Sequence, residues 1–203
     1  MPMITPQQLL QQLQQQSQSR DCMVVAIDGF AGAGKSTLAK WLAEHLEACQ
    51  IMSLDDFYQP LANKQWVQLS EEAALQAYLP TQTLAQQLLQ PLQQGQSITW
   101  QAQDWLTKKL SPEKKIVPRG VILVDGVFSS HKDFRPWVDL RILVSTLPST
   151  CRRRVLARPQ PNTDWFAHWQ RTETWFHNHN KTGLCVDYVT TGSVPQDVKL
   201  DMD

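Results

Sequence analysis

The sequence lacks an excess of charge of either sign, because its 203 residues carry 19 basic and 19 acidic side chains. A balanced chain generates no overall field that would recruit nucleic acid or an anionic membrane. We therefore expect neither of these partners. The composition indicates a small-molecule partner and leaves the oligomeric state, monomer or homo-oligomer, open.

Cysteine is scarce and scattered. The four cysteines are far apart and form no C-x-x-C pair, which predicts reduced, mostly buried thiols. Residues 1–20 have no basic start and no long apolar stretch, so neither a secretory signal nor a membrane span is expected. These absences favour a cytoplasmic protein. The cysteines are Cys22, Cys49, Cys151 and Cys185.

Glycine is also sparse, with eight residues in the chain, yet three of them fall in one pattern, G-x-x-x-x-G-K-[ST]. An apolar, β-branched run at 23–27 precedes the pattern, and a helical periodicity follows it. A chance match in a glycine-containing turn would lack these flanks, so we interpret the pattern as a phosphate-binding loop. Its residues are Gly29, Phe30, Ala31, Gly32, Ala33, Gly34, Lys35 and Ser36, followed by Thr37.

The chemistry of such a loop explains its residue types. Glycines let backbone N–H groups turn toward phosphate oxygens, and the following helix adds its positive end. Lys35 is expected to bridge the β- and γ-phosphates of ATP, and the Ser36 hydroxyl is expected to bind Mg²⁺. We therefore predict that residues 29–37 bind ATP.

Five apolar runs separated by helical patterns predict an α/β fold with a five-stranded parallel sheet. The expected strands are 23–28, 50–54, 121–125, 140–144 and 186–190. The expected helices are 36–48, 71–78, 83–93, 149–158 and 164–179, and a leading amphipathic helix is favoured within the glutamine-rich tract 7–18. No repeat or linker composition marks a second domain, so residues 1–203 are expected to form one.

Acidic residues at the ends of the second and third strands are candidates for the chemistry of the site. Asp55 follows the second strand and could take a proton from an acceptor hydroxyl or hold a magnesium-bound water, or it could cap a turn. Asp125 ends the third strand and is a candidate magnesium ligand, with a strand-end cap as the alternative. Because ligands of open α/β sheets bind beyond the carboxyl ends of the strands, both acids are expected near the phosphate loop.

Four arginines fall within residues 152–158 on a predicted helix. Arg154 and Arg158 are four apart and would share one face, and Arg153 could reach the same phosphate from one side. Guanidinium groups stay charged and bond phosphate oxygens bidentately. An isolated run of this kind would be a solvated helix face, but its place after a phosphate loop and a strand-end acid favours a catalytic role.

Taken together, the loop, the Asp55-Asp56-Phe57-Tyr58 segment, the end of the third strand and the arginine run resemble the uridine kinase and phosphoribulokinase superfamily of P-loop kinases. The resemblance implies a P-loop NTPase three-layer sandwich, with 59–119 as a helical acceptor-side insert and 149–180 as an arginine lid and helix. It also implies that Asp55 is the general base and that Tyr58 accompanies it. The strand-end acid is usually glutamate in uridine kinases, whereas this chain has Asp125.

The insert shows no counterpart of the aromatic, histidine-bearing hairpin that reads the base in typical uridine kinases, so the resemblance leaves the acceptor open. Tyr58, Trp100 and Trp105 are candidates to stack on a planar acceptor group. His177 and His179 are two apart on a predicted helix and point to different faces, which disfavours a shared metal. His131 is expected to be an ordinary loop histidine.

We expect an ATP- and Mg²⁺-dependent kinase that phosphorylates a hydroxyl of a nucleoside-like, sugar or vitamin-like acceptor. One alternative is a regulatory protein that binds nucleotide without transferring a phosphoryl group. Another is a nucleoside monophosphate kinase, which would need a basic group for the acceptor phosphate. The clustered candidates for that group are Lys108, Lys109, Lys114 and Lys115.

Overall fold

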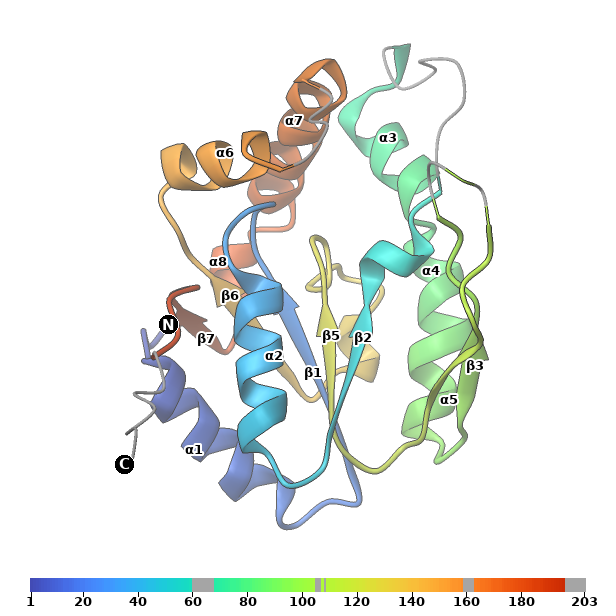
Figure 1. Ribbon diagram of the computed structural model, residues 1–203, viewed down its shortest axis with the longest axis vertical. Helices are drawn as coiled ribbons and strands as arrows, with labels where there is room; N and C mark the ends of the chain where they lie inside the picture. The colour runs from blue at the N-terminus through green and yellow to red at the C-terminus, as the bar shows by residue number, and fades with distance from the viewer. Residues whose placement is uncertain (60–67, 105–106, 108, 159–162, 196–203) are drawn as a thin grey trace, which may run out of the picture.

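A computed structural model describes residues 1–59, 68–104, 107, 109–158 and 163–195 (Figure 1). Its centre is a parallel sheet in the order β2-β5-β1-β6-β7. This confirms the predicted α/β fold and the five predicted strands. The bounds are β1 Cys22–Asp28, β2 Cys49–Ser53, β5 Gly120–Asp125, β6 Leu140–Val144 and β7 Tyr188–Thr190.

The register of the sheet brings the functional strand ends together. Asp125 of β5 pairs with Ile27 of β1 on one side and with Ser53 of β2 on the other. The chain therefore leaves β1, β2 and β5 at the same edge of the sheet. The phosphate loop and both strand-end acids begin at that edge.

Alternate residues of the central strands contribute their side chains to two apolar layers. Val24 and Ile122 belong to one buried cluster, and Val25 and Val121 belong to the other. Because successive side chains of a strand point to opposite faces, this division shows that both faces of the sheet are covered. The fold is a three-layer sandwich, as expected.

Helices α1 and α2 lie in front of the sheet in Figure 1, while α6 and α7 rise beyond its carboxyl edge. Helix α1 begins with a capping box in which Thr5 and Gln8 exchange side-chain and backbone hydrogen bonds. Helix α6 ends at Leu156, two residues before the predicted end. The described helices outside the insert are α1 Pro6–Ser17, α2 Lys35–His45, the 3-10 helix Arg135–Trp137, α6 Pro148–Leu156, α7 Thr163–His179 and α8 Thr182–Cys185.

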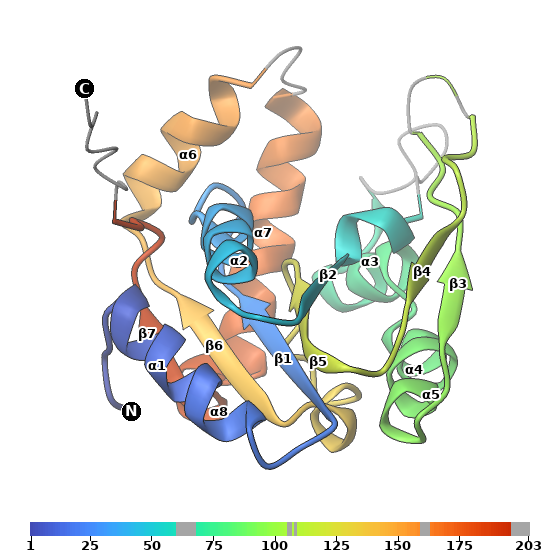
Figure 2. The ribbon, with the colours of Figure 1, turned by 60° about the horizontal axis from the view of Figure 1, so that its bottom comes forward.

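The segment between β2 and β5 begins with a 3-10 helix, Leu54–Phe57, and contains the expected helices. It also contains an antiparallel ribbon, β3 Ile98–Trp100 with β4 Lys114–Ile116, which runs alongside α4 and α5 at the β2 side of the molecule (Figure 2). The expectation of a helical insert did not include this ribbon, because three-residue strands carry no readable apolar run. The helices are α3 Glu71–Tyr78 and a continuous helical stretch, α4 Thr81–Leu84, π-helix Ala85–Leu89 and α5 Gln90–Gln93.

Among the residues that the structure describes, no helix combines the length and the apolar character that crossing a lipid bilayer requires.

Candidate active site

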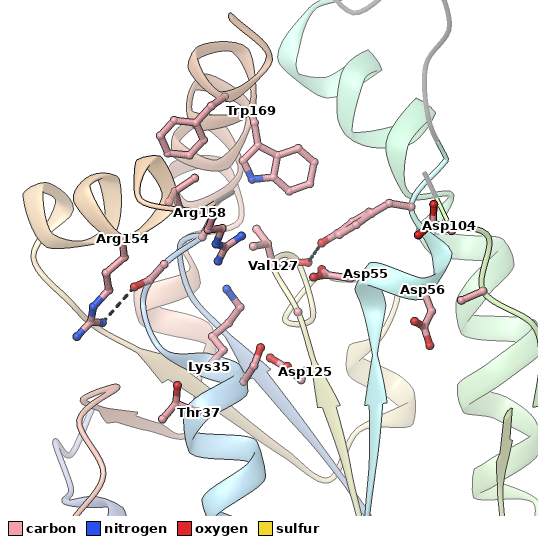
Figure 3. Close-up of a pocket in the computed structure, with 18 of the residues that line it drawn as sticks. Lys35, Thr37, Asp55, Asp56, Asp104, Asp125, Val127, Arg154, Arg158 and Trp169 are labelled. Atoms are coloured by element: carbon pink, nitrogen blue, oxygen red, sulfur yellow. Dashed lines mark hydrogen bonds between the residues drawn. The ribbon is translucent and has the colours of Figure 1, made fainter. Parts of the chain in front are cut away.

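A cavity of about 1020 Å³ opens at the carboxyl edge of the sheet. The phosphate loop and the start of α2 form its floor, the segment after β2 and the tip of the ribbon form one wall, and α6 with α7 forms the other. Figure 3 shows side chains from these elements converging on it, with Lys35 between Arg158 and Asp125, and with Asp55 facing them. The structure thus joins the sequence motifs in one site.

The loop from Gly29 to Lys35 has the geometry of a phosphate cradle. Gly32 and Gly34 have positive φ angles of 81° and 104°. A Cβ atom on Gly32 would lie 2.4 Å from the carbonyl oxygen of Cys151, so only glycine fits there. Helix α2 begins without a side-chain cap, which leaves its first N–H groups for an anion.

Lys35 is buried at the start of α2. Its Nζ donates to the carbonyl oxygens of Gly29 at 2.7 Å and Phe30 at 3.0 Å. The ammonium group therefore lies within the curve of the loop, where a bound phosphate would replace the carbonyls as its partner.

Three residues that sequence reasoning missed hold the loop in place. Asp28 is fully buried, and its Oδ1 accepts hydrogen bonds from the backbone N–H groups of Gly29 at 2.7 Å and Phe128 at 3.0 Å. Its place as the last residue of a buried strand, directly before the first loop glycine, was a signal that could have identified it. Glu173 accepts from the Ala31 N–H at 2.8 Å.

Gly192 is the third, and no sequence signal marked it. It lies in the segment after β7, and a Cβ atom on it would lie 1.9 Å from the carbonyl oxygen of Ala33. Thr146 donates to that same carbonyl at 2.8 Å. The loop is thus backed closely from the far side by two segments that come late in the chain.

Ser36 and Asp125 lie together, as a shared magnesium site requires. Burial raises the pKa of Asp125, whereas its hydrogen bond with Ser36 and the charge of Lys35 lower it. Asp125 Oδ1 is buried and has no hydrogen-bond partner. A buried carboxylate oxygen without a partner, beside a hydroxyl at a phosphate loop, fits the oxygen ligands that Mg²⁺ prefers.

Asp55 faces the cavity from the 3-10 helix that follows β2. Desolvation by the walls of the cavity raises its pKa, the positive charge of Lys35 lowers it, and the charge of Asp125 raises it. Its backbone N–H is capped by Ser53 Oγ at 3.3 Å. The carboxyl group is therefore near both the phosphate loop and the candidate metal ligand.

The neighbouring Asp56 is held by the ribbon. It accepts a hydrogen bond from Trp100 Nε1 at 2.9 Å and forms an ion pair with Lys114 at 2.7 Å. Trp100, predicted to stack on the acceptor, instead packs on Phe57 at 5.4 Å between ring centres and does not line the cavity. Trp105, the other tryptophan predicted to stack there, lies outside the described residues.

Tyr58 lines the cavity but is fixed in place. Its hydroxyl donates to the carbonyl oxygen of Val127 at 2.9 Å, and its ring meets Trp169 edge-on at 5.2 Å. Trp165 and Phe166 of α7 complete an aromatic wall. The sequence did not identify these α7 aromatics as site residues, because an apolar helical pattern does not show where a helix meets a cavity.

The structure places some arginines of the run at the cavity and others away from it. Arg154 and Arg158 line the cavity, and Arg154 Nη1 donates to the Gly32 carbonyl at 3.2 Å. Arg153, predicted to reach the same phosphate, is exposed and outside the cavity lining, because the turn of the helix rotates it off that face. Arg158 lies beyond the helix end, so it shares no helical face with Arg154.

The three histidines considered in the sequence analysis pack against aromatic rings. His177 lies on Phe30 at 4.5 Å, His179 stacks on Trp175 at 4.5 Å, and His131 stacks on Phe176 at 5.9 Å. Within the described parts of the chain, no group of three or more His, Cys, Asp or Glu residues could hold a metal ion.

The family model for an AAA domain matches residues 25–174, which is more than half of the chain. The chain belongs to this AAA-domain family. The matched residues include the phosphate loop, both strand-end acids, the arginine run and the first part of α7, so the family assignment covers the elements that form the cavity.

Relatives of this AAA-domain protein include a cytidylate kinase of Deinococcus deserti, 33% identical over 134 residues, which are 65% of this chain and 60% of that protein. A uridine kinase of Borrelia duttonii is 26% identical over 125 residues, 61% of this chain and 60% of the relative. A solved structure described as a possible uridine kinase from Bacillus stearothermophilus has a TM-score of 0.62, at 18% identity, covering 90% of this chain and 99% of that chain. The fold and the resemblance to P-loop kinases are confirmed, although the match spans 60% of the length of these two curated relatives.

Proposed function

We propose that the protein is an ATP- and Mg²⁺-dependent phosphotransferase that acts on a hydroxyl group of a small molecule. The observation that carries the proposal is that Asp55 faces Lys35 and Asp125 across one cavity. Phosphoryl transfer needs a cradle for the phosphates, charge stabilisation around the transferring group and an oriented nucleophile. All three have candidate residues in this cavity.

Residues 29–37 would bind the phosphates of ATP, and Ser36 with Asp125 would hold Mg²⁺. When bound, the metal ion supplies neutralisation of the charge on the phosphate oxygens. Lys35 would move from the Gly29 carbonyl to a phosphate oxygen, and Arg158 would add a second positive charge above it. Arg154 could leave the Gly32 carbonyl to reach the same group.

Asp55 would accept the proton of the acceptor hydroxyl. Its carboxyl group has a pKa raised by desolvation, which makes the carboxylate a stronger base than an aspartate of ordinary pKa. Lys35 lowers that pKa and so favours the ionised form. The group is thus prepared to take a proton as the hydroxyl oxygen attacks the γ-phosphoryl group.

The walls of the cavity favour an acceptor without a phosphate of its own. Trp165 and Trp169 of α7 form an aromatic wall that Tyr58 meets edge-on, and Asp55 adds a negative charge on the side of the segment after β2. Such a surface suits a flat or polyhydroxylated group and repels an anion. Nucleoside-like, sugar and vitamin-like acceptors meet these conditions, with 59–119 as the acceptor-side insert and 149–180 as the lid.

A nucleoside monophosphate kinase is the second candidate, because a curated relative is a cytidylate kinase. Of the clustered lysines, Lys109 lines the cavity, whereas Lys114 is paired with Asp56 and Lys115 is exposed on β4. Lys108 lies outside the described residues. Among the described lysines of this cluster, a single one is therefore placed to bind an acceptor phosphate, which favours the alcohol acceptor.

Release of ADP from MgATP, measured across a panel of nucleosides, sugars, vitamins and nucleoside monophosphates, tests the proposal. We expect turnover with a phosphate-free alcohol, and a loss of about 10²- to 10⁴-fold in kcat in Asp55→Asn with nucleotide affinity retained. Asp56→Asn is the matched comparison and should lose far less, because its partners are Trp100 and Lys114. Intact MgATP binding without turnover on any acceptor would instead indicate a nucleotide-binding regulator.

A further inference from the structure

Helix α7 carries four side chains at a spacing of four residues: Trp165, Trp169, Glu173 and His177. Residues four apart lie on one face of an α-helix. This face, the α7 stripe, begins at the acceptor wall and ends at the phosphate loop.

The first half of the stripe belongs to the cavity. Trp165 and Trp169 both line it, and their rings stack at 5.1 Å between centres. Trp169 also meets Tyr58 edge-on and forms a side-chain hydrogen bond with Glu173. The acceptor wall is therefore connected directly to a carboxyl group one helical turn further on.

The second half of the stripe holds the loop. Glu173 Oε1 accepts a hydrogen bond from the Ala31 N–H at 2.8 Å, and the His177 ring lies against Phe30. Glu173 is 1% exposed, so it contacts the loop from within the protein and not from solvent. The negative charge of this buried acid therefore lies beside the loop whose backbone N–H groups would bind the phosphates of a nucleotide.

The groups around Glu173 determine whether its carboxyl group is protonated. Burial raises its pKa to about 7, while the Ala31 N–H, Lys35 and Trp169 lower it and Asp28 raises it. Lys35 on α2 and Asp28 on β1 are the charged groups that act on it from neighbouring elements. Tyr58 and Cys151 also face it, but the pKa of each is raised by burial, so both stay neutral near pH 7.

We propose that Glu173 is a positioning residue that ties the acceptor wall to the phosphate loop, and that nucleotide binding draws a proton onto it. The inference rests on the proposed binding of nucleotide. The phosphates bring several negative charges to the loop that Glu173 touches, and a nearby negative charge favours the neutral acid. The neutral acid keeps its carbonyl oxygen as the acceptor for Ala31, so the loop is held while the repulsion is removed.

Calorimetry with Mg²⁺ and a non-hydrolysable ATP analogue, in two buffers of different ionisation enthalpy, measures the proton. Titrations from about pH 7 to about pH 8.5 lie above the last ionisation of phosphate esters, near pH 6, so the ligand contributes little. We expect the wild-type protein to take up a fraction of a proton per nucleotide. If binding raises the pKa of Glu173 from about 7 by about one unit, affinity should weaken about fourfold across this range.

Glu173→Gln should bind without proton uptake, with a flat pH profile, and more tightly than wild type at the alkaline end because the opposing charge is gone. A variant that merely damaged the fold would bind more weakly at every pH. Glu72→Gln, an exposed acid on α3, is the matched control and should keep the wild-type uptake. Asp55→Asn should keep it too, which separates the effect of Glu173 from that of the acid that faces Lys35 across the cavity.

Binding by the wild-type protein without proton uptake, or equal uptake in Glu173→Gln, would overturn the inference while leaving the proposed function intact. Absence of binding would overturn both. If Glu173→Gln does not fold, the wild-type measurement in the two buffers still decides. Trp169→Phe then adds a second test, because loss of its hydrogen bond leaves more Glu173 protonated before binding and should reduce the uptake at about pH 7.

Discussion

At the scale of the residue, the candidate site depends on side chains whose surroundings change their chemistry. Asp55 and Asp125 are both aspartates at strand ends, yet Asp55 faces open cavity and Asp125 is buried against Ser36. One is suited to accepting a proton and the other to holding a cation. Identical residue types are thus distinguished by burial and by their neighbours.

The rate of transfer should depend on the ionisation of Asp55. Because its pKa lies above the ordinary value of 3.8, protonation occurs at a higher pH than in an aspartate of ordinary pKa. We expect kcat to fall on acidification as pH passes down through this raised pKa, since only the ionised group accepts a proton. A profile of kcat against pH checks this, and constant activity down to about pH 4 would contradict it.

Gly192→Ala should weaken nucleotide binding although Gly192 lies far from the loop in sequence. Its new Cβ atom would lie 1.9 Å from the Ala33 carbonyl oxygen, so the loop must shift. Small misplacements of a binding group are costly, and we expect a loss of at least about tenfold in affinity by calorimetry. Gly183→Ala is the control, because there the nearest atom to the new Cβ is 4.0 Å away.

At the scale of the element, the ribbon and α7 determine how the acceptor side is built. The ribbon holds Asp56, next to the candidate base, through Trp100 and Lys114. Helix α7 supplies the aromatic wall and reaches the phosphate loop through Glu173. Neither element belongs to the phosphate-binding motif, but both orient the groups around it.

Trp100→Phe tests the contribution of the ribbon. The phenyl ring can still pack on Phe57, but Asp56 loses its indole donor. A hydrogen bond of this kind contributes about 1 kcal/mol, so kcat/KM for the acceptor should fall about fivefold with nucleotide affinity unchanged.

Two neighbouring lysines on β4 provide a matched pair of variants for the same test. Lys114→Met should act in the same direction as Trp100→Phe, because Lys114 pairs with Asp56. Lys115→Met should have little effect, since the next residue of a strand points to the opposite face. Equal effects of the two lysine variants would contradict a specific role for Asp56.

At the scale of the whole molecule, the sheet separates two buried clusters and leaves its carboxyl edge to the cavity. Packing of the apolar layers holds the strands in position, and the strands in turn position the phosphate loop and the strand-end acids. A polar group such as the free Oδ1 of Asp125 can remain unpaired because the rest of the fold stabilises it. Stability and ligand binding are therefore expected to oppose each other at this position.

Asp125→Asn should separate the two effects in a thermal melt. Replacing a buried carboxylate whose pKa is raised by desolvation should leave the melting temperature of the ligand-free protein equal or higher. Bound ligand stabilises by mass action, about 2.7 kcal/mol at a hundredfold excess over Kd, so the wild-type protein should gain stability with Mg²⁺ and ATP. The variant should lose most of that gain, and an undiminished gain would exclude Asp125 as a metal ligand.

The sequence by itself determined the phosphate loop, the parallel sheet and the strand-end acids, because each is encoded by local pattern: glycine spacing, apolar runs and the residue that follows them. Only the tertiary structure decided that Arg153 faces away, that Trp100 binds Asp56, and that Glu173 and Gly192 hold the loop. These contacts join residues distant along the chain. No local pattern encodes them, since they arise when helices and a short ribbon pack around the end of the sheet.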